Sequence, residues 1–217
     1  MATDWYRRKS WSKTDEEEFF AKLSRARKDG RAQYLKVQAI ELVDTKKPKL
    51  LQVAKELLSK VLNEYPDDNF NKGSVYHTFG NIFQLENNTE KALEYFKKAV
   101  DFEKTFPNVI TQSYLDYAEI VVKNQFKDLY PVAEEMLENK ISRLLFPNEK
   151  YIAFSLLAII NFYNSKAEIG KKYAEMANEN ANAETSGLRY HKYLGIVSSR
   201  DSLLDKVTKS FLKPYSK

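Results

Sequence analysis

The sequence predicts an all-α protein built from stacked antiparallel helix pairs. Aromatic and small residues recur at helical intervals on both sides of a polar break at residues 86–89, which indicates two short helices packed together. This arrangement of aromatic and small residues returns along the chain at a nearly constant period. With six Gly and six Pro among 217 residues, the chain also has too few turn residues for an all-β fold.

The small residues form two series with a common period. In the first series, an aromatic residue or a leucine precedes each small residue, and successive members are 38, 40 and 37 residues apart. In the second series, from the following helix, the steps are 38, 41 and 37. A single helix pair cannot bury its apolar face, so a repeating pair predicts a stack. The two series are Gly80, Ala118, Ala158 and Gly195, then Ala54, Ala92, Ala133 and Gly170.

The helices follow in order from capping and periodicity. Thr14 and Glu17 have the spacing of a capping box, and the acidic run 15–18 favours a helix N-terminus. Pro66 and Pro147 are expected just after helix ends, because the proline ring clashes with a continuing helix. We expect a first helix at 14–28 and then pairs at 33–43 with 49–65, 73–85 with 89–103, 109–123 with 130–144, 149–164 with 167–180, and 186–197 with 202–212.

The segment 76–99 resembles a tetratricopeptide repeat (TPR). That family has a small residue in the first helix, an alanine twelve positions later, and then a large residue and an alanine at steps of four and three. Gly80, Ala92, Phe96 and Ala99 match all four positions. The resemblance implies a right-handed superhelix of stacked pairs, an α-solenoid, that binds a protein or peptide on its concave surface.

The expected organisation is a cap, a stack and a second cap. Residues 1–30 form an aromatic, basic segment and a capping helix, residues 31–188 the TPR-like array, and residues 189–217 a C-terminal helix pair. A polar outer face on the last helix suits a terminal element. The start of the chain, 4–35, is also similar to that of uncharacterised bacterial repeat proteins.

The charge distribution leaves one alternative function open. Residues 1–36 carry ten basic and six acidic side chains, residues 189–217 seven and two, and the middle eighteen and twenty-two. Arg7 and Arg8 beside Trp5 and Trp11 could hold phosphates and stack bases, so a nucleic-acid binder that uses the two basic ends is the alternative. We prefer the interpretation that the tryptophans pack under the first helix as a cap, and expect no nucleic-acid binding.

Catalytic and membrane functions find little support. The chain has no cysteine, and His77 and His191 have no acid or nucleophile at a motif spacing. Phosphate-binding glycine motifs and the HExxH motif are absent. We therefore expect no enzyme activity and no cofactor or metal. No apolar run of about 18 residues occurs, so we expect no membrane partner and a cytoplasmic location; the sequence does not predict an oligomeric state.

The TPR resemblance implies a partner groove lined by the outward residues of each first helix. In chaperone-binding members, Lys, Arg and Asn side chains there clamp a terminal carboxylate. Here Asp116 and Glu119 would repel a carboxylate, so a partner segment of mixed apolar and cationic character is expected. The implied groove residues are Lys36, Ser74, His77, Asn81, Gln84, Gln112, Leu115, Glu119, Ser155, Ile159, Arg189 and Lys192.

Overall fold

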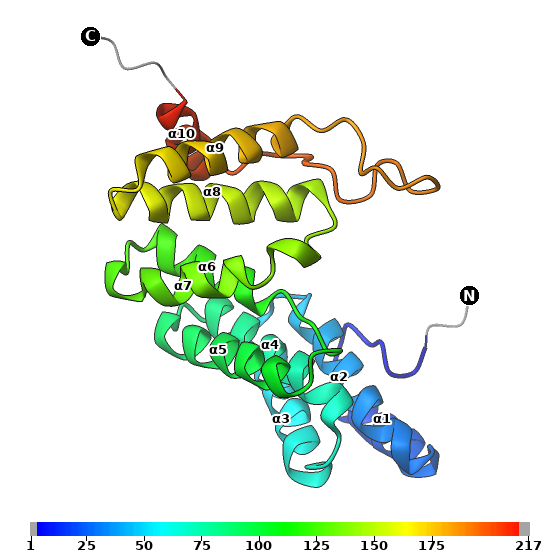
Figure 1. The fold of residues 1–217 in the computed structure, drawn as a ribbon. Coiled ribbons are helices and arrows are strands. Elements are labelled where there is room, and N and C mark those ends of the chain that lie inside the picture. The colour runs from blue at the N-terminus through cyan, green and yellow to red at the C-terminus, as the bar shows by residue number, and fades with distance from the viewer. Residues whose placement is uncertain (1–3, 213–217) are drawn as a thin grey trace. The chain divides into compact units, whose positions relative to one another are not determined.

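The computed structural model describes residues 4–212, and every regular element in that part is helical (Figure 1). This result confirms the all-α prediction and the packing of adjacent helices in pairs. The chain divides into two compact units, Met1–Ser113 and Tyr114–Lys217, a division that the sequence did not predict. Each unit is described by itself below.

The first unit contains two helix pairs behind an N-terminal helix. The pairs are α2 with α3 and α4 with α5, and α4 also packs against α2 and α3. Helices α2 and α4 begin five and four residues earlier than expected. The helices are α1 (Lys13–Arg25), α2 (Lys28–Val43), α3 (Pro48–Glu64), α4 (Asn69–Leu85) and α5 (Thr89–Thr105).

The predicted capping box of Thr14 and Glu17 is wrong, because the N-cap of α1 is Ser12, two residues earlier. The Ser12 hydroxyl accepts the Asp15 backbone N–H at 3.1 Å, and the Asp15 carboxylate accepts the Ser12 backbone N–H at 2.8 Å. This reciprocal pair occupies the helix N-terminus. The hydrogen bonds from Ser12, with those from Arg8 and Ser10, lower the pKa of Asp15 to about 2.

Residues 5–11 pack against α1 and α2 as a cap. Trp5 and Trp11 each lie with ring centroids 5.3 Å from that of the buried Phe19. The buried Gln38 accepts the Arg8 backbone N–H at 3.0 Å and donates to the Arg8 carbonyl at 2.8 Å. The tryptophans therefore pack as expected.

The two arginines of this cap form ion pairs, and Arg7 remains exposed to solvent. Arg7 contacts Glu41 at 2.7 Å, and Arg8 contacts Asp15 at 2.5 Å and Glu18 at 2.6 Å. Both guanidinium groups therefore have carboxylate partners within the unit.

Gly80 makes the small-residue contact that the α4–α5 pair requires. A Cβ atom at this position would lie 2.5 Å from the Phe96 ring, well inside van der Waals contact. Both Phe96 and Ala92 are fully buried. The glycine thus makes room for an aromatic ring of α5, rather than for the backbone around Ala92.

The second unit centres on the α8–α9 pair. Helix α10 packs against both α8 and α9, and α7 packs against α8. Two 3₁₀ turns, Lys127–Leu129 and Ile141–Arg143, flank α7. The helices are α6 (Ser113–Lys123), α7 (Tyr130–Glu138), α8 (Pro147–Tyr163), α9 (Ala167–Ala181) and α10 (Ser202–Phe211).

The helix predicted at 186–197 does not form. Gly187 and Gly195 have φ angles of +78° and +68°, in the left-handed region that interrupts a helix. The Gly195 carbonyl accepts the Asn148 N–H at 2.9 Å, and a Cβ at Gly195 would meet Phe146 at 2.5 Å. The segment is therefore a loop anchored at the start of α8.

Pro147 also differs from its predicted place after a helix end. It is the first residue of α8, where a missing N–H costs no hydrogen bond and the fixed φ suits a helix. Within the described residues, no helix is long and apolar enough to cross a bilayer.

Candidate partner-binding surface

Helices α2 and α4 bring the predicted groove residues of the first unit onto one surface. On α4 these residues recur every three or four positions, which keeps them on one helix face. Lys36 comes from α2. Lys36, Ser74, His77 and Asn81 are half-buried, and Gln84 is exposed. The His77 ring also lies 5.7 Å from the Phe96 ring of α5, between ring centroids.

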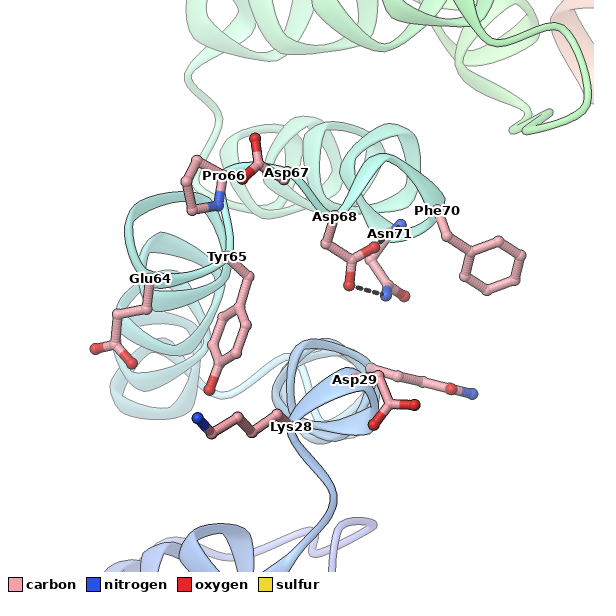
Figure 2. Close-up of a pocket in the computed structure, with 10 residues that line it drawn as sticks. Lys28, Asp29, Glu64, Tyr65, Pro66, Asp67, Asp68, Phe70 and Asn71 are labelled. Carbon is pink, nitrogen blue, oxygen red and sulfur yellow. Dashed lines mark hydrogen bonds between the residues drawn. The ribbon is translucent and has the colours of Figure 1, made fainter.

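A cavity of about 550 Å³ opens beside this surface (Figure 2). The first turns of α2, the connection from α3 to α4, and the first turn of α4 enclose it. None of the twelve groove residues named in the sequence analysis lines this cavity. Its lining residues are Lys28, Asp29, Gln33, Glu64, Tyr65, Pro66, Asp67, Asp68, Phe70 and Asn71.

Asp68 caps the N-terminus of α4 at the edge of the cavity. Its Oδ1 accepts the Asn71 backbone N–H at 3.1 Å, and its Oδ2 accepts the Asn71 Nδ2 at 2.8 Å. Asn71 is only 2% exposed, and Figure 2 shows its amide directed toward α2. The Asn71 Oδ1 has no hydrogen-bond partner among residues 4–212.

The cavity lining is acidic, with four carboxylates and one lysine. Asp29 and Asp67 are exposed, and Glu64 forms an ion pair with Lys60 at 2.7 Å. Asp29 in the first turn of α2 and Asp68 at the cap of α4 also complement the helix dipoles. The field inside the cavity favours a cation.

Lys36 and Phe70 join the cavity to the α2–α4 surface. The Lys36 ammonium lies 5.9 Å from the centroid of the Phe70 ring, and Phe70 is 71% exposed. Burial lowers the pKa of Lys36, and attraction to Asp68 opposes this shift. An exposed aromatic ring beside a partly desolvated lysine is suited to contact with an apolar partner group.

The remaining predicted groove residues do not form a comparable surface. Leu115 and Ser155 are 4% and 0% exposed. Ile159 is half-buried on α8. Gln112 is exposed in the connection before α6, where it precedes the first helical residue. Leu115 and Ser155 therefore offer little side-chain area to a ligand, and the exposed Gln112 is not on a helix face.

Glu119 belongs to an ion-pair network of the second unit. It contacts Lys123 at 2.5 Å, and Lys123 also contacts Asp201 at 2.7 Å. Arg189 and Lys192 are exposed, but they lie in the loop that replaces the predicted helix. Since that helix does not form, no helix face carries them.

A second cavity, of about 590 Å³, lies beside the N-terminal cap and has the opposite charge. Three lysines and Trp11 line it, and no acidic side chain is among its lining residues. Its lining residues are Lys9, Ser10, Trp11, Lys47, Pro48, Lys49 and Leu50.

Comparison with known proteins leaves the family undecided. Protein-family models, curated proteins and solved structures gave no match to this chain. Between Asp4 and Leu212, no group of three or more acidic or histidine side chains is placed to hold a metal ion. The TPR resemblance therefore stays a prediction.

Proposed function

We propose that the chain is a non-enzymatic interaction module, with helix pairs stacked in a TPR-like right-handed superhelix. In this proposal, a protein or peptide segment binds along the α2–α4 surface. The observation that carries the proposal is the acidic cavity joined to that surface by Phe70 and Lys36. A concave site with a few polar groups and an aromatic edge is the usual form of a binding site.

The chemistry of this surface favours a segment with apolar and cationic side chains. Phe70 offers an exposed ring, and the amides of Asn81 and Gln84 lie where a bound backbone could exchange hydrogen bonds. Carboxylates at the cavity would attract a basic side chain and repel an acidic one. Because this surface favours apolar and cationic groups and its carboxylates repel an anion, a TPR-like module that binds a terminal carboxylate is disfavoured.

Nucleic-acid binding is the second candidate, and the basic cavity is the observation that favours it. Lys9, Lys47 and Lys49 line one cavity together with Trp11, a combination that suits phosphates and a stacked base. We rank it second because Trp5, Arg7 and Arg8 already have partners on α1 and α2 of the first unit. Steep salt dependence of single-stranded RNA binding, flattened by Lys47→Glu with Lys49→Glu, would reverse this order.

The test is capture of partners from a lysate of the source cells by the full chain, with and without nuclease. Asn81→Arg with Gln84→Arg adds two charges and bulk to the open side of α4, and surface changes of this kind usually alter stability by about 0.5 kcal/mol or less. Ser202→Arg with Ser210→Arg adds the same charge to exposed positions of α10.

The proposal expects the α4 variant to lose nuclease-resistant protein partners that the α10 variant keeps. Thermal unfolding curves verify that both variants fold. If the α4 variant keeps every partner of the wild-type chain, the binding surface lies elsewhere. If nuclease removes every partner, the nucleic-acid candidate takes first place.

A further inference from the structure

We propose that the cavity at the start of α4 takes an arginine side chain of the bound segment. This inference rests on the proposed function and extends it, because it names the chemical group that the α2–α4 surface recognises. Four features of the described residues support it: the charge of the cavity, an unpaired acceptor, the neighbouring aromatic rings and the position of the cavity.

The charge of the cavity selects a cation. Asp29, Glu64, Asp67 and Asp68 line it together with Lys28. Lys60 pairs with Glu64 and Lys36 is attracted to Asp68, so the negative charge that is least balanced comes from the exposed Asp29 and Asp67. A single exposed ion pair contributes little, because water screens it. Several carboxylates around one concave space act together, since each adds to the same potential. An acidic or neutral side chain would gain nothing from this field.

The unpaired acceptor points to a ligand that donates hydrogen bonds. Asn71 is 98% buried, and its Oδ1 has no partner in the part of the chain that the structure describes, while its Nδ2 donates to Asp68 at 2.8 Å. Buried acceptors are nearly always paired in folded proteins. This oxygen is enclosed in the free protein, so a ligand reaches it only when a neighbouring side chain moves aside.

The aromatic rings favour arginine over lysine. Tyr65 and Phe70 both line the cavity, and the Lys36 ammonium 5.9 Å from the Phe70 ring centroid shows that this ring already attracts a cation. A guanidinium is planar, stacks on aromatic faces and carries five donors, whereas an ammonium is a compact, strongly hydrated charge. An arginine can therefore meet ring, carboxylates and the Asn71 oxygen together.

The position of the cavity fits a side chain from a segment lying along α4. Phe70 precedes Ser74 by one helical turn, and His77 and Asn81 follow on the same face. A backbone on that face would therefore pass the mouth of the cavity, where a long side chain can turn inward.

The test is a titration of the ¹⁵N-labelled full chain with N-acetylarginine methylamide, followed by amide NMR shifts. The proposal expects saturable shifts at residues 28–33 and 64–71. N-acetylcitrulline methylamide has the same shape without the charge, and N-acetylglutamate methylamide has the opposite charge. Both should bind at least about five-fold more weakly, as expected for the loss of about 1 kcal/mol.

Two variants locate the interaction. Asp29→Asn with Asp67→Asn should weaken arginine binding about ten-fold, while Glu175→Gln with Glu179→Gln, on exposed positions of α9, has the same charge change and should leave it unaltered. Asn71→Leu, verified as folded by thermal unfolding, should also weaken binding because it removes the acceptor.

Equal affinity for arginine and citrulline, shifts outside residues 28–33 and 64–71, or unchanged binding by Asp29→Asn with Asp67→Asn would overturn the proposal. These outcomes are separable from those of the partner-capture experiment. Absent arginine binding with loss of partners in the α4 variant would refute the arginine site and keep the interaction surface. Arginine binding with unaltered capture would support the arginine site and refute the α2–α4 interaction surface.

Discussion

Helices α4 and α8 occupy equivalent places in the predicted repeat, yet α4 has a partly exposed face and α8 is mostly buried. On α4, Ser74, His77 and Asn81 remain half-open. On α8, ten of the seventeen residues are buried, among them Ser155. Since α10, α9 and α7 all pack against α8, that helix serves as core. Equivalent repeat positions on α4 and α8 thus share a helix but do not share an exposed surface.

The α4–α5 and α8–α9 pairs each pack a glycine against a phenylalanine, but the glycine comes from the first helix in one pair and from the second helix in the other. In α4–α5, a glycine of the first helix, Gly80, faces Phe96 of the second. In α8–α9, a glycine of the second helix, Gly170, faces Phe162 of the first, where a Cβ would lie 2.6 Å from the ring. Either helix can therefore supply the space that brings a pair close together.

Gly80→Ala tests the closer of the two contacts and should have the largest effect. The added methyl would lie 2.5 Å from the ring of Phe96, which is fully buried and has nowhere to move. We expect a loss of about 3 kcal/mol in unfolding free energy and a melting temperature lower by about 6 to 12 °C.

Calorimetry of Gly80→Ala, Phe96→Leu and the double variant would measure the coupling. The double variant should be more stable than the sum of the single effects implies, because the smaller side chain makes room for the methyl. Additive effects, or a Gly80→Ala variant that melts with the wild-type chain, would contradict the proposed contact.

Gly195→Ala tests why the second unit has a loop at 186–197, where the first helix of the fifth pair was expected. Alanine would have to adopt a φ of +68°, and its Cβ would lie 2.5 Å from the Phe146 Cβ. The expected cost is about 2 kcal/mol. Gly187→Ala is the matched control, because its φ is +78° with open space around it, and it should cost about 1 kcal/mol. Equal melting temperatures for the two variants would show that the contact with Phe146 does not contribute to the stability of the loop.

Acid titration compares the caps of the two units and should show the smallest effect. Hydrogen bonds from Ser12 hold the pKa of Asp15 at about 2, against about 3.9 for an unfolded chain. Its contribution is therefore present above about pH 4 and is lost as the pH falls toward about 2. At the cap of α10, burial raises the pKa of Asp201, but hydrogen bonds from Leu204 and Lys123 outweigh it and lower the pKa.

Carboxyl NMR shifts measured between about pH 5 and pH 1.5 would follow both caps. Arg8→Gln should raise the pKa of Asp15 and leave that of Asp201 unaltered, since Arg8 contacts only the first. An Asp15 midpoint near the unfolded value would mean that the capping pair does not persist in solution.

Most of the helices could be predicted, because their signals are local. Small residues at Gly80 and Ala92, with apolar periodicity, located the α4–α5 pair to within a few residues. The loop at 186–197 could not be predicted, since Gly195 satisfies the pattern of a small helical residue while its φ depends on contact with Phe146. The spacing of Thr14 and Glu17 suggested one cap, but Ser12 and Asp15 compete for the same helix end.

The candidate site was predicted only in part, for a physical reason. The TPR resemblance implied Lys36, Ser74 and Asn81 as groove residues, and helical periodicity keeps Ser74 and Asn81 on one face of α4. The cavity depends on how the corner between α3 and α4 meets the start of α2, which is a long-range contact. Pro66 predicted the end of the preceding helix, but the next helix was expected only at residue 73, so nothing in the sequence showed that Asn71 would be buried beside an open space.

The most direct test of the account is hydrogen–deuterium exchange of the full chain with and without its captured partner. The account predicts slower exchange in the first turns of α2, in residues 64–71 and along α4, with α8 and α9 unaltered. A partner that protects only the second unit, or only residues 5–11 and the neighbouring lysines, would contradict the claim that the α2–α4 surface is the binding site.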